Sequence, residues 1–206
     1  CAAVLAALAL AQPAMAQDVP EPKALTVSGN VTLVSDYRFR GVSQSGGDPA
    51  VQGGLTLTHQ SGVYASAWSS SVDFKKLGAA DVYGSQELDL TAGWSREIAS
   101  GITADLGLAY YAYPGGHVGK ADFLETYGSL ATTYGPARLK LGVNYAWAQG
   151  ALADNRNLYL YGSADAAIPG TPVTLAARLG YQDGPLAGAW VASGGVQHHA
   201  WDWSLG

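Results

Sequence analysis

Residues 24–43 alternate residue by residue between two kinds of side chain. One set, starting at Leu25, is apolar apart from one serine, and the other is mostly polar and contains Asp36, Arg38 and Arg40. Successive side chains of a strand point to opposite faces, whereas helical spacing would place both arginines among the apolar residues. We therefore predict one long strand here, with an apolar and a polar face. Soluble strands average about 5–6 residues, and a tilted strand that crosses a bilayer needs about 9–11.

Nine later segments repeat this alternation, which predicts an all-β chain with ten antiparallel strands. The predicted strands cover 50–59, 63–73, 86–94, 102–110, 123–134, 138–147, 157–167, 173–182 and a tenth from 200. In the second of these, 63–73, we expect the aromatic face with Tyr64 and Trp68 to point outward. The connections alternate between longer loops (43–49, 73–84, 113–122, 148–156, 183–199) and shorter turns (60–62, 95–101, 135–136, 168–172). Transmembrane barrels combine short periplasmic turns with longer outer loops, so we predict an antiparallel up-and-down transmembrane β-barrel.

Composition narrows the class of protein further. The chain has no apolar run of the 18 or so residues that a transmembrane helix requires. Its 27 glycines, 12 tyrosines and six tryptophans suit many strands and turns. The net charge is −5 and no basic patch is visible, so nucleic acid is not an expected partner.

Charged residues of the polar strand faces are the candidates for lining a pore. They are Asp36, Arg38, Arg40, Glu87, Asp89, Asp105, Arg138, Lys140 and Arg178. An arginine or lysine at mid-depth on a lipid-facing surface costs roughly 2–4 kcal/mol, whereas a water-filled interior accommodates it. Aromatic side chains near the strand ends are expected to mark the two membrane interfaces. These interface aromatics are Trp94, Tyr110, Tyr134, Tyr145, Trp147, Tyr181 and Trp201; the alternative is that they cap a soluble β core.

The two ends of the chain carry their own expectations. Residues 1–16 form an apolar run ending in Ala-Met-Ala, which resembles a secretory signal peptide with its cleavage site. Residues 17–23 contain two prolines and read as a short periplasmic lead-in. The chain stops at Gly206 within an alternating strand, so we expect C-terminal strands to be missing. We expect Sec export through the periplasm to the cell outer membrane.

One motif resembles a known family. Residues 35–45, Ser-Asp-Tyr-Arg-Phe-Arg-Gly-Val-Ser-Gln-Ser, are similar to the opening signature of the TorF family, Gram-negative outer-membrane β-barrels regarded as porins. Residues 49–54, 61–70, 87–90, 125–127 and 201–206 continue the likeness. The resemblance implies an outer-membrane porin with about twelve strands when complete. It supplies no catalytic residues.

Three functional hypotheses follow. The first is a channel for passive passage of small polar solutes or ions, in contact with outer-membrane lipid. The second is a non-conducting barrel, plugged by its own side chains, that acts as a structural or loop-mediated binding protein. The third is a soluble secreted barrel with an apolar interior. Arg38 and Arg40 either form a basic patch in the pore or join a salt-bridge lattice with Glu87 and Asp89. The oligomeric state leaves no trace in the sequence.

Enzymatic and metal chemistry find little support. No G-x-S-x-G elbow occurs, and no glycine loop precedes a helix to bind phosphate. His198 and His199 are adjacent, and adjacent side chains of an extended chain point apart, so they make a poor metal site. His59 and His117 have no evident partner either. We therefore predict no enzyme activity, no cofactor and no bound metal.

Overall fold

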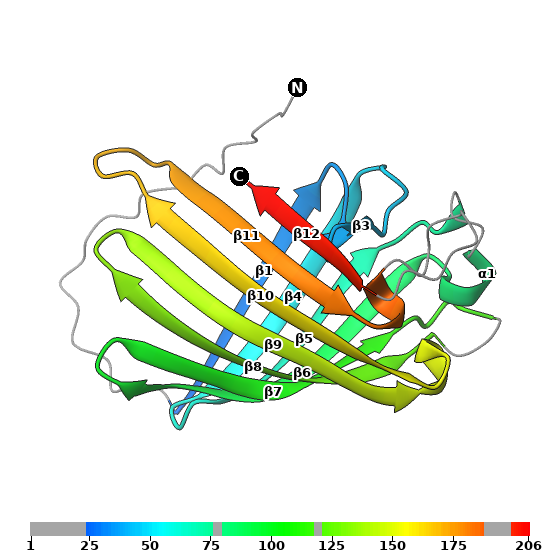
Figure 1. Cartoon of the computed structure of the whole chain (residues 1–206), viewed down its shortest axis with the longest axis horizontal. Coiled ribbons are helices and arrows are strands. Elements are labelled where there is room, and N and C mark those ends of the chain that lie inside the picture. The colour runs from blue at the N-terminus through cyan, green and yellow to red at the C-terminus, as the bar shows by residue number, and fades with distance from the viewer. Residues whose placement is uncertain (1–23, 76–79, 118–120, 188–198) are drawn as a thin grey trace.

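The computed structural model describes residues 24–75, 80–117, 121–187 and 199–206. Ten strands form one antiparallel sheet, and each strand lies next to its neighbour in the chain (Figure 1). The predicted all-β fold and its ten antiparallel strands are therefore confirmed. The predicted signal peptide (1–16), the lead-in (17–23) and His198 lie outside the described residues.

The sheet contains the strands β1 (Leu25–Val34), β4 (Ala50–His59), β5 (Val63–Ser71), β6 (Gln86–Ala99), β7 (Ile102–Ala112), β8 (Phe123–Tyr134), β9 (Ala137–Gln149), β10 (Asn155–Ala167), β11 (Thr174–Asp183) and β12 (His199–Leu205). A separate hairpin pairs β2 (Arg38–Phe39) with β3 (Val42–Ser43). Short helices occur at α1 (Ala80–Tyr83), η2 (Gly150–Leu152) and η3 (Pro185–Ala187). Among the described residues, β1 and β12 are the two edges of the sheet and do not pair with each other.

The strand register gives the sheet two chemically distinct faces. One row of directly paired residues runs Tyr64, Gly93, Gly107, Tyr127 and Asn144 from β5 to β9. This row belongs to the polar phase of every strand, and its side is called the inner face below. The hydroxyls of Tyr64 and Tyr127 meet above the two glycines. Contact between side chains three strands apart shows that the inner face is concave.

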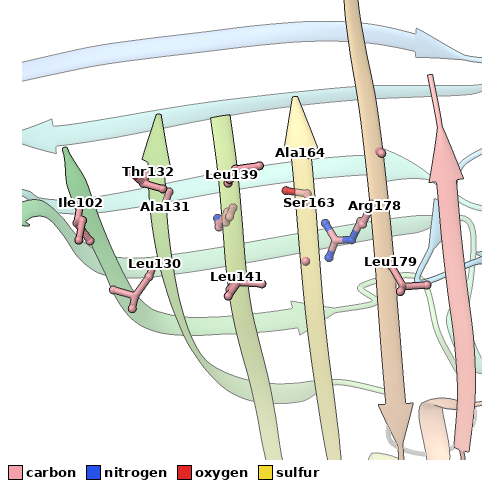
Figure 2. A pocket seen from close by; sticks show the side chains of 13 residues that line it. Ile102, Leu130, Ala131, Thr132, Leu139, Leu141, Ser163, Ala164, Arg178 and Leu179 are labelled. Carbon is pink, nitrogen blue, oxygen red and sulfur yellow. The ribbon is translucent and has the colours of Figure 1, made fainter. Parts of the chain in front are cut away.

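The opposite side, the outer face, is covered by large apolar side chains that are exposed. Val31, Leu141 and Leu205 are 83%, 71% and 76% exposed, respectively. Figure 2 shows the same type of residue, Leu130, Leu141 and Leu179, on β8, β9 and β11. A large contiguous apolar surface marks contact with a membrane or with a protein partner. The leucines and valines of the alternating strands thus lie outside, and the charged residues lie inside.

The prediction of one strand over 24–43 is wrong at its second half. β1 ends at Val34, and residues 38–43 form the β2–β3 hairpin instead. The Gln44 amide donates to the Tyr37 carbonyl at 2.7 Å, which closes this excursion. Gly41, at φ +83°, lies in the left-handed region that favours glycine at the hairpin turn. Tyr37 and Phe39, predicted on the apolar outer face, pack on the inner side against Trp68 and Tyr111.

The expected outward aromatic face of the 63–73 segment is also wrong. Tyr64 and Trp68 point to the inner face, where Tyr64 donates to Asp105 at 2.8 Å. Their cross-strand neighbours explain the choice. A Cβ at Gly93 would lie 2.8 Å from the Tyr64 ring, and one at Gly54 would lie 3.2 Å from the Trp68 ring. The glycines leave the space that these inward rings occupy.

Candidate functional site

Asp36 fixes the conformation of the β2–β3 hairpin through local contacts. Its carboxylate accepts a hydrogen bond from the Ser43 hydroxyl at 2.5 Å and contacts Arg38 Nε at 2.7 Å. Burial raises the pKa of Asp36, but the Ser43 hydrogen bond and the Arg38 charge outweigh it, so the pKa lies below its ordinary value. Ionised Asp36 therefore stabilises the fold of residues 35–45.

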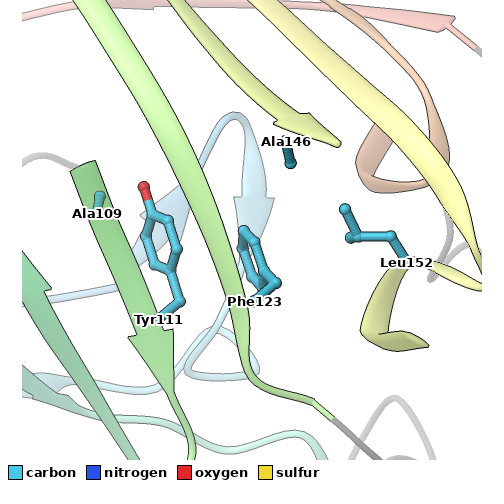
Figure 3. Close-up of a cluster of buried hydrophobic side chains, with 5 residues drawn as sticks. All are labelled: Ala109, Tyr111, Phe123, Ala146 and Leu152. Carbon is cyan, nitrogen blue, oxygen red and sulfur yellow. The ribbon is translucent and has the colours of Figure 1, made fainter. Parts of the chain in front are cut away.

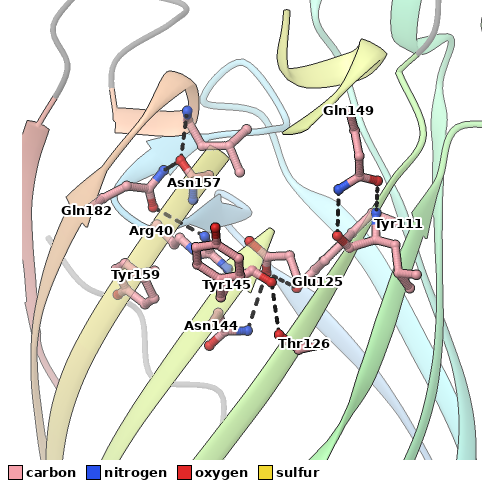
Figure 4. Close-up of polar contacts among 12 residues, drawn as sticks. Arg40, Tyr111, Glu125, Thr126, Asn144, Tyr145, Gln149, Asn157, Tyr159 and Gln182 are labelled. Carbon is pink, nitrogen blue, oxygen red and sulfur yellow. Dashed lines mark hydrogen bonds and ion pairs between the residues drawn. The ribbon is translucent and has the colours of Figure 1, made fainter. Parts of the chain in front are cut away.

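Arg40, at the hairpin tip, is the centre of the polar contacts inside the sheet (Figure 4). Its Nη2 lies 2.5 Å from Glu125 Oε2 of β8, and its Nη1 donates to Gln182 Oε1 of β11 at 3.3 Å. The guanidinium also stacks on the rings of Phe39 and Tyr159, at 4.6 and 4.4 Å from their centroids. Arg40 thereby ties the hairpin to two strands far apart in the sheet.

The expected lattice of Arg38 and Arg40 with Glu87 and Asp89 is not what the structure contains. Arg40 pairs with Glu125, and Arg38 pairs with its neighbour Asp36. The two arginines also differ in burial: the Arg38 side chain is 60% exposed, whereas that of Arg40 is 6% exposed. The hairpin turn between them separates side chains that a continuous strand would have kept on one face.

Glu87 and Asp89 form a second acidic group, on β6. Glu87 is buried and accepts a hydrogen bond from the Tyr113 hydroxyl at 3.4 Å. Within the part of the chain that the structure describes, Glu87 Oε2 and Asp89 Oδ1 have no hydrogen-bond partner. The two carboxylates thus place concentrated acidic charge on the inner face of β6.

Aromatic and aliphatic side chains fill the inner face at the long-loop end. Figure 3 shows Tyr111 and Phe123 from adjacent strands beside Leu152 of η2. The rings of Tyr111 and Phe123 stack at 4.5 Å, and Phe39 of the hairpin meets Tyr111 edge-on at 5.6 Å. A second group, Val72, Phe74 and Tyr83, continues the packing below the α1 loop. We call these two groups together with the hairpin the plug.

The short-turn half of the inner face carries cations and tyrosines instead. Lys140 of β9 and Arg178 of β11 both lie over the Tyr161 ring of β10, at 5.9 and 4.2 Å from its centroid. Arg138 is paired in register with Asp165, one row nearer the turns. In the described parts of the chain, none of these three cations has a carboxylate within 4.0 Å.

The nine residues predicted to line a pore thus divide into four groups on the inner side. Asp36, Arg38 and Arg40 belong to the hairpin, Glu87 and Asp89 lie beneath it, and Asp105 bonds Tyr64. Arg138, Lys140 and Arg178 occupy the short-turn half. Sequence reasoning left Glu125, Tyr159 and Gln182 out of the candidates. Glu125 was visible in the polar phase of its strand, but no local signal connects it to Arg40.

The seven predicted interface aromatics lie in the outward phase of their strands. Tyr134 and Trp201 are 83% and 67% exposed, and Tyr110, Tyr145 and Trp147 are also exposed. Trp94 and Tyr181 are half-buried. Trp94 is not at a strand end as predicted, because β6 continues to Ala99, and its indole donates to the Ser61 carbonyl at 3.1 Å.

The described residues contain no group of three histidine, cysteine or acidic side chains that could hold a metal ion. No helix in these residues has the length and apolar character needed to cross a membrane. The inner face therefore offers charge, hydroxyls and aromatic rings as its chemistry.

The fold and the inner face define an all-β protein with one exposed apolar face and one polar, charged face. Residues 20–206 match the model of a family described as "Bacterial protein of unknown function (Gcw_chp)", and the chain belongs to this family. Comparisons with curated proteins and with solved structures gave no significant match.

Proposed function

We propose that the chain is an outer-membrane β-barrel of porin-like type, through which small polar solutes or ions pass passively. The observation that carries the proposal is the exposure of large apolar side chains along every strand of the outer face, with charged groups on the inner face. A protein in water would bury such a surface, whereas hydrocarbon accepts it. The resemblance of residues 35–45 to the TorF family agrees with this reading.

The edges of the sheet fit the same environment. In lipid an unpaired row of backbone N–H and C=O groups is not tolerated, because no water can satisfy it. Each of the edge strands β1 and β12 would therefore need a pairing partner in the membrane, and such pairing closes the sheet into a barrel. The short turns would lie on the periplasmic side and the long loops outside.

The plug favours a second candidate function, a non-conducting barrel that acts as a structural or loop-mediated binding protein. The hairpin with Arg40, the stacked Tyr111 and Phe123, and Leu152 occupy the inner face at the long-loop end. In a closed barrel these groups would narrow the outer mouth. The channel proposal therefore requires the hairpin to leave room for a solute or to move.

Planar-bilayer conductance separates the two candidates. We expect purified protein to give stable single-channel steps, and Arg40→Met to give larger or more frequent steps because the hairpin loses its tie to Glu125 and Gln182. Arg38→Met is the matched control, because its ion pair is exposed and local. Silence of both the natural protein and Arg40→Met at high protein dose contradicts the channel and supports the plugged barrel.

A further inference from the structure

The short-turn half of the inner face contains two cations that converge on one aromatic ring. Lys140 Nζ and the Arg178 guanidinium carbon lie 5.9 and 4.2 Å from the centre of the Tyr161 ring. The two residues come from strands on either side of β10, so both cations lie against the same ring. Two like charges held close together repel, and a bound anion would remove that cost.

Ser163 places a hydroxyl between the two cations. The register pairs Ser163 with Lys140 on one side and with Arg178 on the other. Adjacent strands lie about 4.8 Å apart, so the three side chains form one row across three strands. Figure 2 shows the Arg178 side chain extending from β11 toward Ser163 on β10. The row thus offers an ammonium, a hydroxyl and a guanidinium on the same side of the sheet.

The protein itself uses only one of the nitrogen donors of this row. Among the described residues, Lys140 makes no hydrogen bond or ion pair, and Arg178 donates only from Nε, to the Tyr159 hydroxyl at 3.4 Å. The neighbouring acids are engaged or lie in other rows: Asp202 accepts from Tyr159 at 3.1 Å, and Asp165 faces Arg138. The terminal nitrogens of Arg178 therefore remain available to a ligand.

Glycines on the strands either side of β10 leave the space that the rings of Tyr159 and Tyr161 occupy. A Cβ at Gly142 would lie 2.3 Å from the Tyr161 ring, so only glycine lets this ring lie flat across β9. A Cβ at Gly180 would collide with the Tyr159 hydroxyl and with Asp202. The rings of Tyr159 and Tyr161 stack with their centroids 5.7 Å apart, and this contact restrains the Tyr161 ring. The two glycines and the stacked Tyr159 thus fix the Tyr161 ring on which both cations lie.

From this geometry we propose that Lys140, Ser163 and Arg178 form a binding site for a small oxyanion, a carboxylate or phosphate group of a solute. The planar guanidinium fork matches two oxygens of such a group, and the hydroxyl and ammonium supply further donors. If the barrel conducts, the site deepens the proposed function, because it would concentrate anionic solutes near the short-turn mouth.

Equilibrium binding tests the site without depending on conductance. The full chain, folded in detergent micelles, would be titrated with inorganic phosphate and with acetate by calorimetry. We expect saturable binding of either oxyanion that weakens at least tenfold in Lys140→Gln and in Arg178→Gln. Arg138→Gln removes a cation from the next row and is expected to change the affinity less than twofold. Circular dichroism checks that each variant is folded.

The outcomes separate this proposal from the channel. If the natural protein binds neither oxyanion, or if Arg138→Gln weakens binding as much as Arg178→Gln, the site is wrong even when the protein conducts. If oxyanions bind but no current flows, the site stands and the channel fails. In a conducting protein, the reversal potential in a potassium chloride gradient should shift toward cation selectivity in the Lys140→Gln, Arg178→Gln double variant and not in Arg138→Gln.

Discussion

Arg40 and Glu125 form an ion pair of 2.5 Å between side chains that are 6% and 0% exposed. The partners are 85 positions apart in the chain, and the pair connects the β2–β3 hairpin to the middle of the sheet. Removing one member of a buried pair leaves the other charge without compensation, which usually costs about 3–5 kcal/mol. The pair therefore anchors the hairpin part of the plug to β8.

The first prediction concerns this pair. Arg40→Met is expected to lower the free energy of unfolding by about 3–5 kcal/mol, because Glu125 remains buried without its cation. Arg38→Met is expected to cost about 0–1 kcal/mol, because its ion pair with Asp36 is exposed. Urea titration of the protein folded in lipid vesicles measures both. Equal decreases in the free energy of unfolding of the two variants would show that the buried Arg40–Glu125 pair stabilises the protein no more than the exposed Arg38–Asp36 pair.

The second prediction concerns the solvent of the outer face. Leu55 is 64% exposed on that face, and the adjacent Thr56 lies on the inner face of the same strand. If lipid covers the outer face, Leu55→Arg should make folding into vesicles less favourable by roughly 2–4 kcal/mol. Thr56→Arg should cost much less, because its side chain enters the polar interior. Indistinguishable effects of the two arginines in a folding titration would refute a lipid-covered outer face.

The third prediction concerns the glycine row below Tyr127. A Cβ at Gly107 would lie 2.3 Å from the Tyr127 hydroxyl and 2.5 Å from the Ala92 carbonyl oxygen, so the backbone must shift. We expect Gly107→Ala to cost about 1–3 kcal/mol, the usual range for overpacking. Gly53→Ala is the matched control, because its nearest contact would be 3.4 Å away. Denaturation of both variants side by side measures the difference, and equal stability would contradict the close contact.

The fourth prediction concerns acid. The pKa of Asp36 is lower in the folded chain than its ordinary value of 3.8, so the stabilisation is fully present above that value and is lost as the pH falls through the folded pKa. We expect the protection of the Gln44 backbone amide, measured against an unstructured amide at the same pH, to fall only below about pH 3.8. Asp36→Asn should give the faster exchange already at neutral pH. Equal exchange of this amide in the natural protein and in Asp36→Asn at neutral pH would show that Asp36 does not stabilise the fold of residues 35–45.

The strand faces were predictable because each depends on residues two positions apart. The alternation at Leu88, Leu90 and Ala92 identifies the outer phase of β6 without any tertiary information. The same rule placed Glu87, Asp89, Lys140 and Arg178 on the inner side. It failed for Tyr64 and Trp68, because their orientation depends on glycines of the neighbouring strands, which the alternation within one segment cannot reveal.

The sequence by itself therefore determined the strand type, the number of strands in the sheet, their antiparallel order and the face of the charges that lie on those strands, since a period of two is a local property of the chain. Only the tertiary structure decided that residues 38–43 leave the sheet, that Arg40 pairs with Glu125, and that Lys140 and Arg178 both lie over the Tyr161 ring. The Arg40–Glu125 contact joins residues 85 positions apart. The energies of such contacts depend on how the sheet curves and which groups are desolvated together, and no short sequence pattern encodes either.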